Sequence, residues 1–413
     1  MTPKPIAAEY PEGGFQAWMT VFGALLLQFA AGYTNVFGVY QDFFVQNFLS
    51  DFTPSQISWI GSVATFITFS GGLISGRLFD RGYFYPLIIG GSVLVVFCLF
   101  MLSLAQPQHY YQVVFLTLGL GYGIGTGMIY VPTVAIVSHY FLRRRALAMG
   151  IVSSGTSLGA LLHPIMLNNL FHGSTGFANG VRASAGLIGG TMLISVLIMR
   201  TRLPPSKTAN SGLAKAAWKF AHDGVYLTAF FGMFLFVQGI FFPLVYIQLD
   251  SDEHGLSRTF GFYSLAMMNG AGFFGRLAGG ATVNHLGVFN TLVFCGFACS
   301  ALVFSMVAVH TIAGVTLFSL LYGFFSGAYV SLLSPMMASL ASDVSEIGFA
   351  LIAVFVPRSS NPVAWTPITG ALLGRKFTWW RPAVYAGVMT FSGTVLFLVC
   401  RFVVARRKGT AYC

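Results

Sequence analysis

Residues 268–287 read MNGAGFFGRLAGGATVNHLG and place one cation, Arg276, in the middle of an apolar, glycine-rich segment. An arginine at membrane depth costs about 2.5–3.5 kcal/mol on insertion scales, so it normally faces a cavity or an anion. Its planar guanidinium donates two parallel hydrogen bonds to a carboxylate and keeps its charge near neutral pH. The stretch therefore predicts a membrane protein that handles an organic anion. Pairing of Arg276 with helix-end carbonyls or lipid phosphate is the alternative.

The composition is that of an integral membrane protein. Of the 413 residues, 56% are hydrophobic and only 8% are charged, which leaves too little polar surface for a water-soluble protein. Apolar runs of about 20 residues, the length that crosses a hydrocarbon core of about 30 Å, recur along the chain. We predict an all-α membrane protein with twelve transmembrane helices, at residues 16–40, 56–79, 85–105, 111–138, 147–171, 181–200, 225–249, 260–283, 290–310, 312–340, 347–373 and 383–401.

The basic residues predict the orientation in the membrane. The formal net charge is +11, but its lysines and arginines lie mainly in alternate loops. With the N-terminus inside, fifteen of them are cytoplasmic and five are outside, as the positive-inside rule requires. We therefore expect a multi-pass protein of the plasma membrane with cytoplasmic N- and C-termini. Its partner is the lipid bilayer, and no nucleic acid is implied.

A polar stretch divides the predicted helices into two groups of six. We expect a leader at 1–15, a six-helix bundle at 16–200, a cytoplasmic linker at 201–224, a second bundle at 225–401 and a tail at 402–413. The motif Tyr122-Gly123-x-x-x-Gly127 recurs as Tyr322-Gly323-x-x-x-Gly327, an offset of 200 residues. This repeat predicts a duplicated six-helix unit with a substrate site near the membrane midplane.

Two basic motifs at the cytoplasmic ends are candidates for conformational control. The second span ends with Gly76-x-x-x-Asp80-Arg81, in which the Asp80 carboxylate can accept hydrogen bonds from a neighbouring helix start or an arginine. Arg144 and Arg145 belong to a run of three arginines that can meet anionic lipid headgroups. We interpret both motifs as gating elements.

Polar side chains inside the predicted spans are candidates for lining the substrate cavity. An amide, hydroxyl or imidazole in hydrocarbon needs a partner, so each such group either joins helices or faces a cavity. A histidine inside a helix is more often bonded to a carbonyl than active in proton transfer. Besides Arg276, the candidates are Tyr33, Asn35, His163, Gln238, Asn269 and Tyr322.

The sequence indicates neither an enzyme nor a metal centre. The five cysteines have no spacing typical of a metal site or a disulfide framework. His139, His163, His172 and His285 are scattered and have no paired acid. A nucleotide-binding loop is absent from the sequence as well. We expect no cofactor.

Two segments carry a resemblance to a known family. Residues 12–18 read EGGFQAW, and residues 140–150 read YFLRRRALAMG, followed by Gly155 and Gly159. With the end of the second span, these segments make the chain resemble fungal-type monocarboxylate porters of the major facilitator superfamily. The resemblance covers nearly the whole chain and implies the major facilitator fold. It also implies that Arg276 binds the substrate carboxylate.

The chain departs from that family at positions tied to proton coupling. Asn35 stands where proton-coupled members carry a lysine, and Gly272 stands where they carry an acid one turn before Arg276. Ala350 replaces an arginine of related fungal chains. We therefore expect transport to respond weakly to a pH gradient, with His163 as the one candidate for a proton relay.

These observations predict a secondary active or facilitative transporter of a monocarboxylate or a carboxylated, amphipathic metabolite, with export of a fungal secondary metabolite as one form. A nutrient sensor of the same fold, which binds but transports little, is the alternative. Import and export look alike in sequence, and an accessory subunit is left open. Arg358, in the proline-interrupted eleventh span, is either a second cavity cation or a residue that reaches the headgroups.

Overall fold

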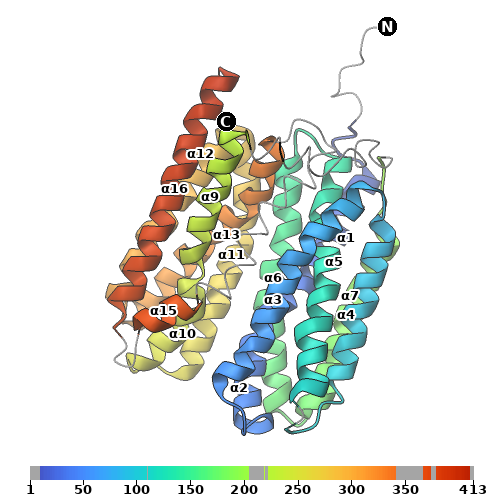
Figure 1. The fold of residues 1–413 in the computed structure, drawn as a ribbon, viewed down its shortest axis with the longest axis vertical. Coiled ribbons are helices and arrows are strands. Elements are labelled where there is room, and N and C mark those ends of the chain that lie inside the picture. The colour runs from blue at the N-terminus through green and yellow to red at the C-terminus, as the bar shows by residue number, and fades with distance from the viewer. Residues whose placement is uncertain are drawn as a thin grey trace. The chain divides into compact units, whose positions relative to one another are not determined.

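The computed structural model describes residues 10–108, 110–203, 218, 222–340, 366–373 and 378–409, and every regular element in these ranges is a helix (Figure 1). Ten helical stretches there are long and apolar enough to cross a membrane. The expected all-α membrane fold is confirmed. α11 (Arg258–Leu286), which carries Arg276, is not among the ten, because its glycines and polar side chains lower its hydropathy. Most of the predicted span at 347–373 lies outside the described residues, as does Arg358.

The helices form two compact units. The first comprises Met1–Arg145 and Leu158–Asn210, so α6 contributes residues to both units. Within it, α3 and α4 pack on α5, and α7 packs on α1 and α4. Its elements are α1 (Phe15–Ala31), η2 (Gly32–Val36), α2 (Phe37–Phe43), η3 (Phe44–Phe48), α3 (Pro54–Asp80), α4 (Phe84–Leu102), η4 (Tyr110–Gly121), α5 (Tyr122–Ala135), η5 (Ile136–His139), α6 (Arg145–His172) and α7 (Gly176–Ile198).

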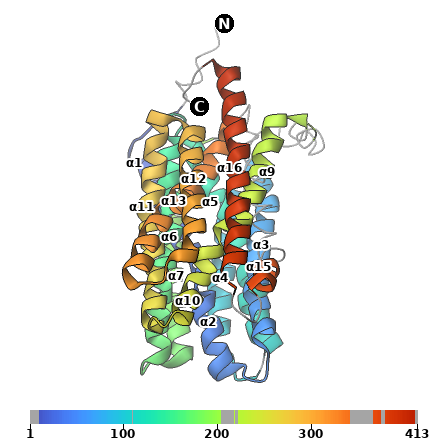
Figure 2. The ribbon, with the colours of Figure 1, turned by 90° about the vertical axis from the view of Figure 1, so that its left-hand side faces the viewer.

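The second unit comprises Ala146–Ser157 and Ser211–Cys413. Its closest pairs are α11 with α13 and α16 with α9, and Figure 2 shows α16 running between α9 and α12. Its elements besides α11 are α9 (Gly224–Ile240), α10 (Phe242–Glu253), α12 (Val288–Ser305), η7 (Met306–Ala308), α13 (Ile312–Leu340), α15 (Thr366–Leu373) and α16 (Trp380–Lys408).

The first span of the first unit is broken. α1 gives way to the 3₁₀ segment η2 before α2 begins. Side chains compete with the helical hydrogen bonds here, because Thr34 Oγ1 donates to the Ala31 carbonyl at 2.9 Å and Asn35 Nδ2 donates to the Gly32 carbonyl at 3.2 Å. Breaks of this kind expose backbone carbonyls that other groups must satisfy.

The first span of the second unit has a break at the corresponding place. α9 ends at Ile240, and α10 starts at Phe242 with Pro243 in its first turn. Proline has no N–H to donate, so it suits the start of a new helix and interrupts the old one. Tyr322 donates its hydroxyl to the Ile240 carbonyl at 2.5 Å and so satisfies a carbonyl at this break.

The repeated Tyr-Gly-x-x-x-Gly motif brings equivalent helices into backbone contact in each unit. On α5, a Cβ added to Gly127 would lie 3.3 Å from Gly71 Cα of α3. On α13, a Cβ added to Gly327 would lie 2.7 Å from Gly272 Cα of α11. Glycine is required at position 327, where an added Cβ would overlap the backbone of Gly272, and at position 127 an added Cβ would be tightly fitted. The internal repeat seen in the sequence therefore corresponds to a repeated helix contact.

Candidate substrate site

A small cavity of about 20 Å³, partly open to its surroundings, lies at the break between α1 and α2 in the first unit. η2 and α2 form one wall, and α3 and the junction of η4 with α5 form the other. Its lining is aromatic and apolar with a few hydroxyls, as small-molecule sites usually are. The lining residues are Tyr33, Thr34, Phe37, Tyr40, Gly61, Ala64, Leu118 and Tyr122.

The hydroxyl groups of Tyr40, Tyr33 and Ser184 form a chain of hydrogen bonds with one direction. Ser184 Oγ donates to the Val181 carbonyl at 2.9 Å, so it accepts at 3.1 Å from the hydroxyl of Tyr33. The Tyr33 oxygen in turn accepts from Tyr40 across 2.5 Å. The protons of both tyrosine hydroxyls are therefore used within the protein, and each oxygen keeps at least one lone pair.

The hydrogen bond between Tyr122 and Thr34 also uses the tyrosine hydroxyl as the donor. Thr34 Oγ1 donates to Ala31, so the Tyr122 hydroxyl, 3.3 Å away, donates to Thr34. Tyr122 is fully buried, and its ring lies 5.9 Å from that of Tyr33. The cavity accordingly offers aromatic faces and hydrogen-bond acceptors rather than donors.

His163 supports the wall behind Tyr33. Its Nε2 lies 3.2 Å from the Phe29 carbonyl oxygen, which can only accept, so Nε2 carries the proton. Its ring also contacts the rings of Phe29, at 4.5 Å, and Tyr33, at 5.4 Å. Within the described residues, the buried Nδ1 has no hydrogen-bond partner. This is the carbonyl-bonded histidine that the sequence favoured over a proton relay.

Arg276 lies in the second unit, and its observed partner is a backbone group. Its Nη1 donates to the carbonyl of Ser153, in the α6 segment of that unit, at 2.7 Å. The side chain is half-buried. A bond to a carbonyl is what we expect if Arg276 has a structural role. Binding of a substrate carboxylate by Arg276 stays a prediction.

Two of the other predicted lining residues bond to their own helical segments, and the remaining two are buried in the second unit. Asn269 donates to the Leu265 carbonyl of its own helix at 3.1 Å, as Asn35 does to Gly32. Tyr322 is fully buried at the α9–α10 break. Gln238 is buried on α9, and its Nε2 has no partner among the described residues. None of these four belongs to the Tyr33 cavity.

The end of α3 carries the predicted gating motif. Gly76 is buried, Asp80 is half-buried as the last residue of the helix, and Arg81 is exposed. Within the described part of the chain, Asp80 has no hydrogen bond or ion pair. Its role as a latch therefore stays a prediction.

The two signature segments, 12–18 and 140–150, meet in the structure. The Glu12 carboxylate accepts backbone N–H bonds from Leu142 at 2.9 Å, Arg143 at 2.6 Å and Arg144 at 3.1 Å. The Glu12 N–H donates to the Tyr140 carbonyl at 3.1 Å. Burial raises the pKa of the Glu12 carboxyl, but the three backbone donors outweigh it and leave that pKa below its ordinary value. We call this contact the Glu12 clip.

The sequence did not single out Tyr40, Tyr122 or Ser184 as site residues. Tyr33 and Tyr40 are seven residues apart, which places them on one face of a helix two turns apart. That spacing could have indicated from the sequence that Tyr33 and Tyr40 lie close together. Ser184 comes from a distant helix, and nothing in the sequence pairs it with Tyr33.

Known proteins place the chain in a family. Residues 15–357 match the model of the Major Facilitator Superfamily. The chain is 38% identical to the "Aspyridones efflux protein apdF" of Emericella nidulans over 398 residues, 96% of this chain and 80% of that protein. It is 34% identical to the "Agnestins efflux protein AgnL12" of Paecilomyces divaricatus, with 98% and 89% covered, and 34% identical to the "Fujikurins efflux protein" of Gibberella fujikuroi, with 96% and 85% covered.

Solved structures show the same fold. The transporter FucP in its outward conformation superimposes with a TM-score of 0.73 at 15% identity, covering 92% of this chain and 98% of FucP. The superfamily expected from the sequence is confirmed, whereas the relatives are named as efflux proteins and not as monocarboxylate porters. The chain belongs to the Major Facilitator Superfamily and is a multi-pass membrane transporter.

Proposed function

We propose that the protein exports an amphipathic, ring-bearing metabolite, one hydroxyl group of which reaches the small Tyr33 cavity. The observation that carries this proposal is the direction of the hydrogen bonds around that cavity, which leaves tyrosine oxygens as acceptors beside aromatic faces. A ligand with ring surface and O–H or N–H donors complements both features. Export is supported by the names of the relatives, which are efflux proteins.

Arg276 is the residue that we propose contacts an anionic group of the substrate. Its guanidinium is half-buried in an otherwise apolar helix and donates through Nη1 to the Ser153 carbonyl. The planar fork of a guanidinium fits a carboxylate, which supports this role. The substrate class is then a carboxylated or otherwise anionic amphiphile. A monocarboxylate is the simplest member of that class.

The cavity is tested by efflux from liposomes that contain the purified protein, with a panel of hydroxylated aromatic, carboxylated and uncharged compounds. Tyr122→Phe should raise KM because the Thr34 contact is lost and the polar wall loosens. Tyr122→Leu should lower efflux about tenfold or more, since the ring face is lost as well. Tyr263→Leu, at an exposed tyrosine of α11, is the matched control. Parent-rate efflux by well-folded Tyr122→Leu would remove the cavity from the mechanism.

Arg276 is tested by the order of two variants. Arg276→Lys keeps the charge but loses the planar fork, so it should weaken transport of an anionic compound. Arg276→Ala loses both and should nearly abolish it. Arg401→Ala, at a half-buried arginine of α16, controls for loss of a cation elsewhere in the second unit. Binding of a compound without any flux would instead favour the sensor alternative.

A further inference from the structure

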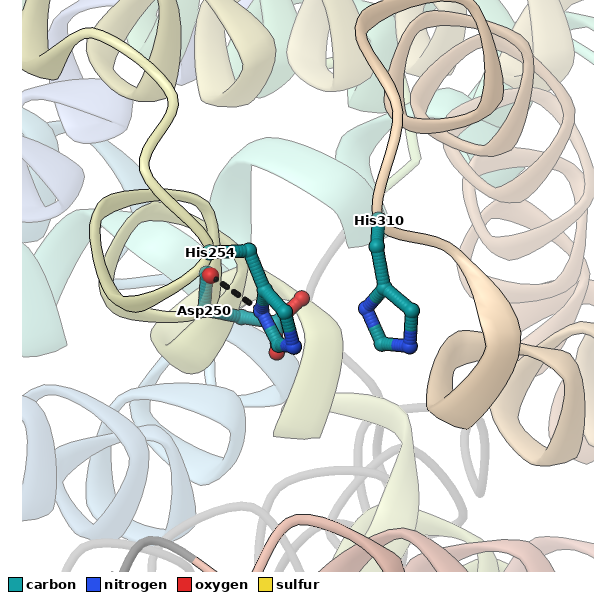
Figure 3. Close-up of side chains that lie close together, drawn as sticks. All are labelled: Asp250, His254 and His310. Carbon is teal, nitrogen blue, oxygen red and sulfur yellow. Dashed lines mark hydrogen bonds and ion pairs between the residues drawn. The ribbon is translucent and has the colours of Figure 1, made fainter.

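Three potential metal ligands of the second unit lie close together (Figure 3). Asp250 and His254 lie one turn apart at the end of α10, and His310 lies in the connection between η7 and α13. One ligand atom from each residue lies within 4.8 Å of the others. This group is far along the sequence from every residue of the Tyr33 cavity.

Asp250 has a buried carboxylate that lacks a permanent positive partner. The residue is 4% exposed, and an ionised carboxylate in such a place needs a counter-charge. Its Oδ1 lies 3.4 Å from His254 Nδ1. No lysine or arginine among the described residues forms an ion pair with it. A bound cation would supply the missing charge.

The hydrogen bonding of His254 leaves its outer nitrogen available. Nδ1 lies 2.8 Å from the Asp250 backbone oxygen, which can only accept, so Nδ1 carries the proton. In the neutral ring, Nε2 then has a free lone pair. A metal-binding histidine commonly donates its other N–H to a backbone carbonyl in this way, which fixes the ring for coordination.

His310 supplies the third ligand from another element. It is exposed, and its ring stacks on that of His254 with centroids 4.0 Å apart and 23° between the planes. Stacked rings aim their lone pairs along parallel planes, so the His310 ring must turn toward the ion. Bonds of about 2.1 Å hold ligand atoms no more than about 4.2 Å apart, so the group must also close slightly.

We propose that Asp250, His254 and His310 bind one divalent ion of the zinc class, with a fourth position open to water. Two imidazoles and one carboxylate suit zinc and its neighbours in the transition series, whereas magnesium prefers oxygen ligands alone. The ion would tie the end of α10 to the chain just before α13. Because α10 follows directly after the break at Phe241, this tie would hold the part of the span that follows the break.

The test is zinc titration of the purified full-length protein by calorimetry, with an affinity tag that contains no histidine. The parent should bind one zinc ion per chain, and magnesium should give no heat. His310→Ala and His254→Ala should each weaken zinc binding at least tenfold. His285→Ala, at an exposed histidine of α11, should bind as the parent does.

The zinc titration can be interpreted independently of misfolded variants and of the proposed transport function. His310 is exposed, so His310→Ala carries the decision even where Asp250→Asn fails to fold. No substrate is present in the titration, so the outcome is independent of the proposed transport function. Absence of zinc binding by the parent, or equal binding by the parent and His310→Ala, would overturn the proposal.

Discussion

His163 holds the broken first span together through the proton on Nε2. The Phe29 carbonyl that it contacts belongs to the last turns of α1, just before the 3₁₀ segment, where the regular helical bonds end. A donor at this point contributes about 1 kcal/mol, and its ring also fills the space behind Tyr33. The contacts of His163 are therefore those of a residue that stabilises the fold.

Substitution of His163 by two amides separates this role from proton transfer. Glutamine places an N–H donor near the position of Nε2, so His163→Gln should retain most of the stability and transport. His163→Asn reaches less far and should behave like His163→Ala, with a melting temperature several degrees lower. The measurement is thermal unfolding in detergent together with efflux under an imposed pH gradient. Proton-driven efflux that is lost in His163→Gln would contradict the structural role.

The Glu12 clip predicts a dependence of stability on pH. Because the pKa of Glu12 in the folded protein is lowered from 4.5, its stabilising effect is complete above that pH and is lost as the pH falls through the lowered pKa. Glu12→Gln should therefore melt at a lower temperature than the parent near pH 7. The difference should shrink as the pH falls below 4.5 and through the lowered pKa of Glu12. An equal difference at both pH values would exclude ionised Glu12 as the cause.

The sequence indicated some of the polar residues near the Tyr33 cavity but not the groups to which they bond. Tyr33 and His163 were predicted from polarity inside an apolar span, and both lie at or behind the cavity. Asn35 was predicted as well, but it is exposed and bonds to its own backbone. Polarity alone does not say whether a side chain points to a cavity or back to its helix, because that depends on the local break.

Helix packing in the two units depends on glycines that let backbones touch. At Gly327, an added methyl group would meet the backbone of Gly272, which cannot move aside as a flexible side chain does. We expect Gly327→Ala to lower the melting temperature and the yield of folded protein. Gly190→Ala is the control, since nothing lies within 4 Å of a Cβ at that helical position.

The control variant should equal or slightly exceed the parent, because alanine favours a helix over glycine by about 1 kcal/mol. Thermal unfolding of both variants in detergent decides the matter. Unchanged melting of Gly327→Ala would show that α11 and α13 are less tightly packed than the structure has them.

The repeat was visible in the sequence, but the breaks in the first span of each unit were not. Residues 16–40 and 225–249 each read as one continuous apolar run. Thr34 and Asn35 interrupt the first by bonding to backbone carbonyls, and Pro243 interrupts the second. Hydropathy measures length and polarity, so it does not register a change in backbone hydrogen bonding inside a span.

The whole molecule is predicted to place both chain ends in the cytoplasm. In a Cys413→Ser background, the remaining four cysteines are buried. An engineered Asp51→Cys, at an exposed position before α3, should react with an impermeant thiol reagent on intact cells. Thr201→Cys, exposed after α7, should react only after the membrane is permeabilised. The reverse pattern would invert the topology.

Fold class and family followed from the sequence because they rest on features spread along the chain. Twenty-residue apolar runs and alternating basic loops survive errors of a few residues at each boundary. The polar contacts behind the Tyr33 cavity instead join residues far apart in the sequence, such as Tyr33 and Ser184, which are 151 positions apart. Such pairings arise from how helices pack, and a single sequence carries no direct record of them.

The Glu12 clip also has a consequence for how the protein is made. Glu12 leaves the ribosome early, but the N–H groups that it accepts belong to residues 142–144, after the fourth predicted span. Glu12 therefore lacks these hydrogen-bond partners until four helices have been inserted and the loop before α6 has been synthesised. Closure of the clip marks that point in biogenesis. A fusion partner placed directly before Tyr10 would compete with this late step, so a tag at the C-terminal end is the safer choice for expression.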